Sequence, residues 1–161
     1  QEPDMIQKLG DENALPTQLY LSTNAADYKS FLKINRPRYD DSWERWNRTL
    51  KMLSTLGTRT VLRITLIRGY NDNEEMIPVF ASLLQKSNAH FVEIKSYMHI
   101  GRSTNRLEHS DMLEMDEVRS FANKLAQENS DFTVMDESGI SRIVILQNKK
   151  RFVDRFIPAC C

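Results

Sequence analysis

Two runs of aliphatic and β-branched residues also contain polar and charged side chains, which packing of a core does not require. Arg63 and Thr65 alternate with Leu and Ile in one run, and Glu93 and Lys95 alternate with Val and Ile in the other. Side chains alternate across a strand, so each polar pair lies on one face. Guanidinium, carboxylate and ammonium groups are costly to bury unless they are paired or bound to something. These residues therefore indicate either a network of mutual ion pairs or a site for a charged ligand.

An earlier run repeats the pattern, because Ser22 and Asn24 share a face opposite Leu19 and Leu21. Strands of an ordinary doubly wound sheet are apolar on both faces, since helices cover both. Three consecutive strands with one polar face instead predict the lumen of a barrel. The polar residues gather toward the carboxyl ends of these strands, where α/β ligand sites lie.

Strands and helices alternate along the chain. Strands are predicted at 15–24, 60–67, 91–97, 132–135 and 142–147, and helices at 41–56, after residue 72 and at 115–127. Asp41 and Glu44 are placed to cap the first of these helices, and Gly57 to end it in a left-handed conformation. This order predicts an α/β fold, a parallel (β/α) partial barrel with helices outside and a polar concave inner face.

Length and composition predict one soluble unit, residues 1–161, with 40% apolar and 27% charged residues. No stretch is apolar enough to span a membrane, so no membrane partner is expected. The first residues lack a signal peptide, and the only cysteines, Cys160 and Cys161, are adjacent and form no disulfide framework. A cytoplasmic, reducing location and a piece of a longer protein are expected.

The net charge is zero, but its distribution is uneven. Residues 29–70 carry ten Lys and Arg against three acids, residues 71–138 carry six against thirteen, and residues 139–161 carry five against one. Residues 148–161 are accordingly predicted to form a basic C-terminal tail. The first basic stretch is either a set of solvated helix faces or a polyanion-binding surface. That surface would consist of Lys29, Lys33, Arg36, Arg38, Arg45 and Arg48.

Several catalytic motifs are absent from the sequence. It contains no Gly-rich phosphate loop, no G-x-S-x-G elbow and no H-E-x-x-H pair. His90, His99 and His109 are scattered, which is typical of packing or surface histidines.

Four long motifs resemble one family. They are L-P-T-Q-L-Y-L-S-T-N-A (15–25), K-I-N-R-P (33–37), T-R-T-V-L-R-I-T-L-I-R-G-Y-N (58–71) and F-V-E-I-K-S-Y-M-H-I-G (91–101). Together with N-R-L (105–107) and D-E-S-G-I-S-R-I-V (136–144), they resemble tRNA 4-demethylwyosine synthase, a radical S-adenosylmethionine family, and most closely its archaeal branch. The resemblance extends over residues 15–147.

The resemblance implies a reaction and its cofactors. Such enzymes use a 4Fe-4S cluster to cleave S-adenosylmethionine, and the resulting radical abstracts hydrogen from 1-methylguanosine at tRNA position 37, in the anticodon loop. Carbons from pyruvate then close the tricyclic base. The family's cluster-binding C-x-x-x-C-x-x-C loop lies upstream of the matched segment. The chain therefore resembles the C-terminal half of the barrel, roughly its fourth to eighth strands. Alone it is expected to be inactive, with the missing N-terminal half as its partner.

The resemblance also implies roles for single residues. Cofactor contacts fall on Ser22, Asn24, Arg63, Thr65 and Asn71. Asn24 stands where the family usually has a carboxylate. The alternatives are loop capping for Ser22 and Asn24, pairing with Glu93 for Arg63, and turn chemistry for Asn71. Substrate or tRNA contacts fall on Arg36, Arg38, Tyr97, Arg102 and Arg106, although packing is an alternative for Tyr97.

Lys95 is the candidate catalytic residue. A desolvated lysine there could form a Schiff base with pyruvate. Ranked ahead of this is an ionic role, in which Lys95 pairs with Glu93 or with a substrate carboxylate. Two other functions stay open from the sequence: a non-catalytic RNA-binding or interaction module, and a metal-independent, aldolase-like lyase that uses Lys95.

Overall fold

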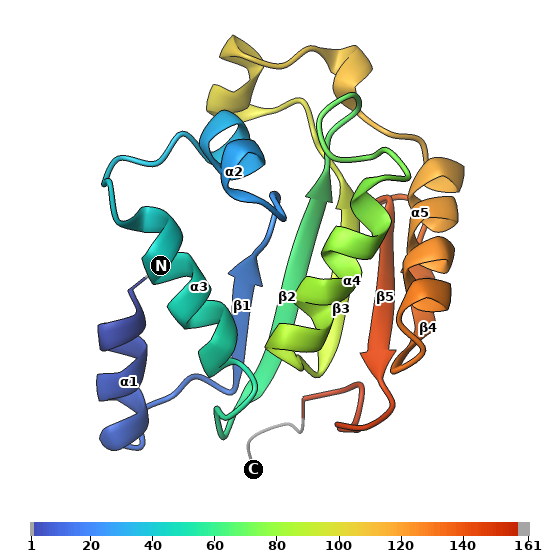
Figure 1. Ribbon diagram of the computed structural model, residues 1–161. Helices are drawn as coiled ribbons and strands as arrows, with labels where there is room; N and C mark the ends of the chain where they lie inside the picture. Colours follow the sequence, from blue (N-terminus) through green and yellow to red (C-terminus); the bar gives the residue numbers. More distant parts are fainter. Residues whose placement is uncertain (1, 158–161) are drawn as a thin grey trace.

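The computed structural model, which describes residues 2–157, places five strands in one mixed sheet of order β1-β2-β3-β5-β4 (Figure 1). The strands are β1 (Gln18–Ser22), β2 (Arg59–Leu66), β3 (Phe91–Ser96), β4 (Phe132–Ser138) and β5 (Ile143–Asn148). The α-helices are α1 (Pro3–Asp11), α2 (Tyr28–Asn35), α3 (Ser42–Met52), α4 (Met76–Ser87) and α5 (Met115–Glu128). Two 3₁₀-helices, η1 (Gly101–Asn105) and η2 (His109–Asp111), lie between β3 and α5.

The first three strands are parallel, as predicted, and they separate the two kinds of side chain. Leu21 of β1 is in register with Leu62 of β2, and both are buried toward the helices. One residue further along, Ser22 is in register with Arg63, and Arg63 with Glu93. The alternation therefore places the polar residues of all three strands together on the other face, as the sequence predicted.

The prediction that all strands are parallel was wrong. β5 runs antiparallel to both β3 and β4. Only residues 139–142 join β4 to β5, and a parallel pair needs a crossover of a dozen residues or more. Arg142, with a φ of 49°, helps to close this short turn. The sheet thus begins as a parallel βα array and ends in an antiparallel hairpin.

The core lies between the sheet and helices α3, α4 and α5, which cover one face in Figure 1. Trp46 is fully buried and stacks on Trp43 with ring centroids 5.1 Å apart. The α3 boundaries differ from the prediction. The Asp41 side chain makes no capping hydrogen bond and instead accepts one from Arg45 Nε at 2.8 Å. The helix ends at Met52, well before Gly57.

Two helices were not predicted from the sequence. In α2, Asp27 caps the first turn by accepting a hydrogen bond from the Ser30 amide at 3.0 Å, and Arg36 ends the helix with a φ of 45°. Helix α1 packs beside α3, with Asp4 2.7 Å from the Arg48 guanidinium. The two helices have only nine and eight residues, so an apolar stripe repeats over few turns and gives little sequence signal.

The described part of the predicted basic tail is anchored to the domain. Arg151 donates to the carbonyls of Leu53 at 2.9 Å and Asn88 at 2.8 Å. Gln147 donates to the carbonyl of Val153 at 2.8 Å, which holds the segment beside β5. Cys160 and Cys161 lie outside the described residues. Within the described part of the chain, no helix has the length and apolar character needed to cross a membrane.

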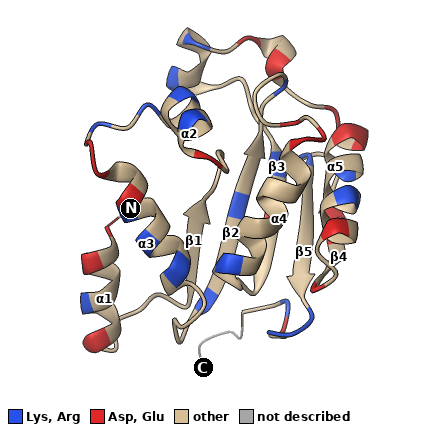
Figure 2. Cartoon of the chain, in the orientation of Figure 1, with Lys and Arg blue, Asp and Glu red and all other residues tan. Residues whose placement is uncertain are grey.

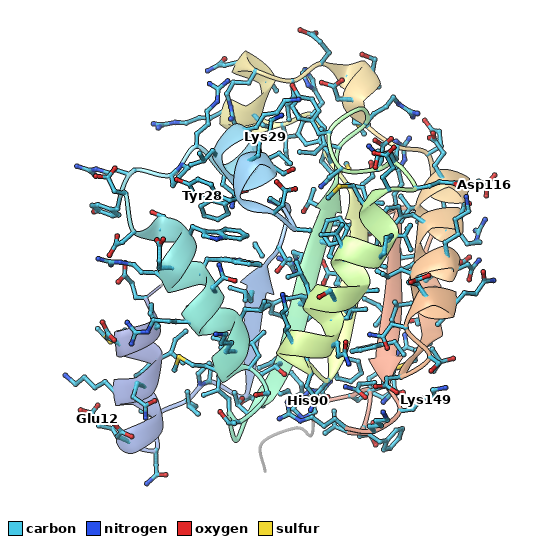
Figure 3. The ribbon with its side chains drawn as sticks, in the orientation of Figure 1. Glu12, Tyr28, Lys29, His90, Asp116 and Lys149 are labelled. Carbon is cyan, nitrogen blue, oxygen red and sulfur yellow. The ribbon has the colours of Figure 1, made fainter. Side chains whose placement is uncertain are left out.

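His90 is buried at the amino end of β3 and is labelled in Figure 3. Its Nδ1 accepts a hydrogen bond from the Thr60 amide at 3.1 Å, which requires that nitrogen to be unprotonated. Burial, with the nearby charges of Arg151 and Arg59, lowers the pKa of His90 to about 4. His90 is therefore a packing residue, as the sequence predicted.

We expect His90→Asn to remove part of the acid sensitivity of folding, because Asn Oδ1 can replace the Nδ1 acceptor without titrating. Between pH 7 and pH 5, the unfolded histidine gains a proton that the folded one refuses, so wild-type stability should fall by about 2 kcal/mol. Urea unfolding at both pH values measures this. Equal losses in wild type and variant would contradict the assignment.

Candidate functional site

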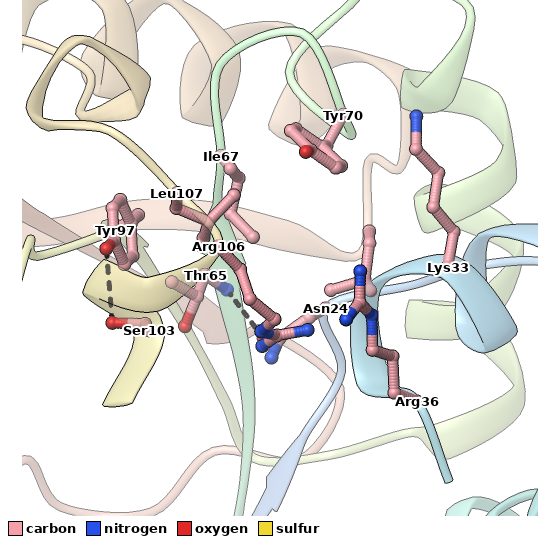
Figure 4. A pocket seen from close by; sticks show the side chains of 11 residues that line it. Asn24, Lys33, Arg36, Thr65, Ile67, Tyr70, Tyr97, Ser103, Arg106 and Leu107 are labelled. Atoms are coloured by element: carbon pink, nitrogen blue, oxygen red, sulfur yellow. Dashed lines mark hydrogen bonds between the residues drawn. The ribbon is translucent and has the colours of Figure 1, made fainter. Parts of the chain in front are cut away.

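A pocket of about 230 Å³ opens at the carboxyl edge of the parallel strands (Figure 4). Its polar lining comes from the loop after β1, helix α2, the end of β2, and the segment after β3. Six of its residues were candidates from the sequence: Asn24, Lys33, Arg36, Thr65, Tyr97 and Arg106. The fold thus brings residues implied for the cofactor and residues implied for RNA into one pocket.

Asn71 fixes this edge of the sheet. Its side chain is fully buried, and Oδ1 accepts a hydrogen bond from the Ile67 amide at 2.7 Å. Its Nδ2 donates to the carbonyls of Asn24 at 2.8 Å and Thr65 at 2.9 Å. Both donor hydrogens are therefore used within the protein. Asn71 acts here as a positioning residue that joins the ends of β1 and β2, which goes beyond the turn chemistry considered from the sequence.

Asn24 and Thr65 form the side of the pocket nearest the strands. Asn24 Oδ1 accepts a hydrogen bond from the Thr65 amide at 3.2 Å, drawn as a dashed line in Figure 4. This bond uses the carbonyl end of the side chain, and the Asn24 amide group makes no other hydrogen bond among the described residues. A donor is thus left for a ligand.

Three cationic side chains line the pocket mouth: Lys33, Arg36 and Arg106. None of them forms an ion pair with a described residue, and no Asp or Glu lines the pocket. Figure 2 shows the positive groups on α2 at this edge. Lys33 Nζ lies over the Tyr70 ring, 4.4 Å from its centroid. The electrostatics of the pocket therefore favour an anionic ligand.

Tyr97 forms the opposite wall and is almost fully buried. Its hydroxyl donates to Ser103 Oγ at 3.1 Å, and Ser103 Oγ donates to the Ile100 carbonyl at 2.6 Å. His99 Nδ1 lies 3.3 Å from the same tyrosine hydroxyl. These bonds fix the ring against η1, so Tyr97 offers a rigid wall.

Arg63 and Glu93 lie one step below the pocket and are paired with each other. Arg63 Nε and Nη2 contact the two Glu93 carboxylate oxygens at 2.7 and 3.1 Å. The guanidinium also lies over the Tyr20 ring, 4.3 Å from its centroid. This bidentate pair is the alternative considered from sequence, and it explains how Glu93 is buried. Ser22, the other cofactor candidate on this row, is exposed at the end of β1.

Lys95 is half-buried on the same face, in register with Thr65 of β2. The predicted ion pair between Lys95 and Glu93 does not form, because Arg63 occupies the Glu93 carboxylate. Lys95 has no hydrogen bond or ion pair with any described residue. An ammonium group of this kind can engage a substrate carboxylate.

The remaining RNA candidates separate into two groups. Arg38, in the loop after α2, and Arg102, in η1, are exposed but do not line the pocket. Arg45 and Arg48, part of the predicted polyanion surface, are neutralised: Arg45 pairs with Asp41 and Glu2, and Arg48 with Asp4. The available positive charge is thus concentrated on α2 and at the pocket.

Sequence reasoning missed Tyr70 and Ser103 as pocket residues, and it named Lys33 only as part of the possible polyanion-binding surface. Tyr70 belongs to the motif R-G-Y-N, so the signal was present in the sequence. Among residues 2–157, no three His, Cys, Asp or Glu side chains gather as a metal site. The donor set described here therefore does not fit an iron–sulfur cluster.

Fold and site together define the class of protein: an α/β domain with a pocket for an anion at the carboxyl edge of its parallel strands. Comparison with known proteins shows which of them this chain is similar to. Residues 86–148 match the family model for wyosine base formation. An S-adenosyl-L-methionine-dependent tRNA 4-demethylwyosine synthase from Methanocaldococcus jannaschii is 41% identical over 94% of this chain and 45% of its own length. A synthase of the same name from Pyrococcus abyssi is 37% identical over 89% of this chain and 42% of its own length.

Solved structures agree with these relatives. A structure of TYW1 with a lysine–pyruvate adduct bound superposes with a TM-score of 0.75 at 40% identity, over 88% of this chain and 44% of that one. A crystal structure of archaeal TYW1 gives 0.68 at 35% identity, over 90% of this chain and 45% of that one. The resemblance inferred from the motifs is confirmed: the chain is similar to tRNA 4-demethylwyosine synthases along almost its whole length. It spans less than half the length of these relatives.

We expect Asn71→Asp to destabilise the chain by about 3 kcal/mol or more, because a carboxylate would face two carbonyls that now accept hydrogen bonds. The matched control is Asn73→Ala, which removes one exposed acceptor for the Met76 amide and should cost about 1 kcal/mol or less. Urea unfolding measures both. Similar costs for the two variants would contradict the positioning role of Asn71.

Proposed function

We propose that the chain is part of a radical S-adenosylmethionine enzyme that converts 1-methylguanosine at tRNA position 37, with pyruvate, to 4-demethylwyosine. The observation that carries this proposal is the pocket with three unpaired cations and no acidic lining residue. The resemblance of the chain to named synthases supplies the reaction.

The pocket chemistry fits both ligands of that reaction. S-adenosylmethionine ends in a carboxylate, and tRNA presents phosphates, so either anion would gain from Lys33, Arg36 and Arg106. The free Asn24 amide suits a ribose hydroxyl or a carboxylate. Because Asn24 replaces the family's usual carboxylate, it adds no negative charge to oppose an anion.

The pocket contains both residues implied for the cofactor and residues implied for the RNA, and this proximity suits radical chemistry. Hydrogen transfer requires the reacting atoms to come within about 3–3.5 Å of each other. We infer that Asn24 and Thr65 face the cofactor while Arg36, Arg106 and Tyr97 face the RNA. The protein would then hold the target base, splayed from the anticodon loop, against the cofactor.

S-adenosylmethionine would supply the radical on reduction by a cluster, and this chain would position it. Arg63, which is held by Glu93 but partly exposed, is proposed to lie beneath the cofactor and to offer its remaining N–H donors. Cluster ligands are proposed to come from the part of the protein that the relatives have beyond this chain. That N-terminal half would cover the polar face of β1–β3, and the chain alone would be inactive. A cytoplasmic location is part of this proposal.

Lys95 is proposed to attract the carboxylate of pyruvate. Its ammonium group has no anion to neutralise it within the described residues, and it projects from the polar face beside Thr65. A lysine–pyruvate adduct is present in the TYW1 neighbour. Covalent capture of pyruvate by Lys95 is therefore the second candidate, with expulsion of water as the imine forms.

We expect Arg36→Gln and Arg106→Gln each to weaken tRNA binding by the full-length enzyme about tenfold or more, since each removes a charged contact to phosphate. Each should also reduce the slope of log Kd against log salt by about 0.7 to 0.9. Arg48→Gln is the control, because Asp4 already pairs with Arg48. Fluorescence anisotropy across a salt series measures all three, and unchanged slopes in both pocket variants would contradict an RNA role.

Borohydride trapping with labelled pyruvate tests the role of Lys95 in the full-length enzyme. An ionic role predicts that Lys95 stays unmodified while Lys95→Ala loses turnover through misplaced substrate. Peptide mass spectrometry locates the label. A reduced pyruvyl adduct on Lys95 would reverse the order of the two candidates.

A further inference from the structure

Tyr39 is a large aromatic side chain that the fold leaves open to solvent. It lies in the loop between α2 and α3, and 55% of its surface is exposed. The guanidinium of Arg38 lies 5.8 Å from the ring centroid, and that of Arg45 lies 5.6 Å from it. Two arginines therefore border a ring that packs little against the core.

These cation–π contacts are loose by comparison with others in the chain. Arg63 lies 4.3 Å from the Tyr20 centroid, and Lys33 lies 4.4 Å from the Tyr70 centroid. At 5.6 to 5.8 Å, the two guanidiniums beside Tyr39 are near the outer limit of about 6 Å for such contacts. With more than half of its surface exposed, the ring has room for a stacked partner.

The two arginines differ in the charge they leave available. Arg45 is 2.8 Å from Asp41 and 2.8 Å from Glu2, so it is neutralised and held beside the ring. Arg38 has no carboxylate partner among the described residues. Tyr39 therefore has one fixed neighbour and one neighbour whose charge is free for an anion.

The loop connects this ring directly to the pocket. Arg36 lines the pocket, and Tyr39 follows it by three residues, so their Cα atoms are at most about 11 Å apart. Figure 1 shows the loop leaving the end of α2 on the outside of the molecule. A single-stranded nucleic acid that enters the pocket can thus continue past Tyr39.

We propose that Tyr39 is a stacking platform for an RNA base that neighbours the nucleotide held in the pocket, with Arg38 on an adjoining phosphate. This inference rests on the proposed function, which places RNA at the pocket. Aromatic rings next to unpaired cations are how proteins hold single-stranded nucleic acid. An acidic protein partner would use the charge, but it would gain no base stacking on the ring.

The test compares variants of the full-length enzyme in binding to an anticodon stem-loop. Stacking contributes about 1–3 kcal/mol per base, so Tyr39→Ala should weaken binding by roughly five- to 150-fold in Kd. Tyr39→Phe keeps the ring and should bind within about twofold of wild type. Phe152→Ala is the matched control, because Phe152 is 73% exposed and follows β5, which runs antiparallel to β3 and so ends at the amino end of the parallel strands, away from the pocket.

An abasic nucleotide placed at tRNA position 36 or at tRNA position 38 of the stem-loop identifies the stacked base. At one of these two positions, loss of the base should weaken binding to the wild-type enzyme and should weaken binding to the Tyr39→Ala variant little further. Additive losses at both positions, or a Tyr39→Ala variant that binds like wild type, would overturn the platform. If Arg36→Gln and Arg106→Gln also bind like wild type, the proposed function fails with it; if they still lose affinity, only the platform fails.

Discussion

The side chain of Asn71 holds the carboxyl ends of β1 and β2 in place, and the pocket depends on it. One carboxamide satisfies an amide of the β2–α4 loop and two carbonyls, one after β1 and one in β2. Unpaired, these backbone groups would each cost free energy at a buried position. Because an amide both donates and accepts, neither a carboxylate nor an aliphatic residue can replace it. The positions of Asn24 and Thr65 follow from this contact.

Charged side chains on the sheet face are paired with each other, whereas those at the nearby pocket are not. On the sheet face, Arg63 and Glu93 neutralise each other with two hydrogen bonds, which makes the burial of Glu93 tolerable. At the pocket edge, Lys33, Arg36 and Arg106 have no such partner and remain in contact with solvent. Paired charges stabilise a fixed structure, whereas unpaired ones are available to a ligand. The boundary between the two lies at the carboxyl end of β2.

The antiparallel hairpin gives the sheet a different end from the one a complete (β/α) array would have. β5 inserts between β3 and β4, so β3 is paired on both sides while β1 and β4 are the edges. At the amino end, Arg59 donates to the carbonyls of Arg155 and Phe156 and holds the last described residues there. The carboxyl end carries the longer loops, with η1 and η2 among them. The pocket described above lies at that end.

The sequence by itself determined the three parallel strands, the helices that cover them and the polar face. Alternation and helical periodicity are local properties, so Arg63, Glu93 and Lys95 could be placed on one face without a structure. The sequence motifs also pointed to the family, although Tyr70 within one of them was not recognised as a pocket residue. Helices α1 and α2 were not predicted, because nine and eight residues repeat an apolar stripe over few turns.

Only the tertiary structure decided how side chains distant in sequence pair with one another. Arg63 and Lys95 share a face with Glu93, and Glu93 pairs with Arg63, whose guanidinium donates two hydrogen bonds to the carboxylate. Asn71 was compatible with turn chemistry or ligand contact until its three partners were located. The short β4–β5 connection limits that pair to an antiparallel hairpin, but only the tertiary structure decided that β5, and not β4, pairs with β3. Partner choice is a property of packing and distance, and sequence periodicity carries neither.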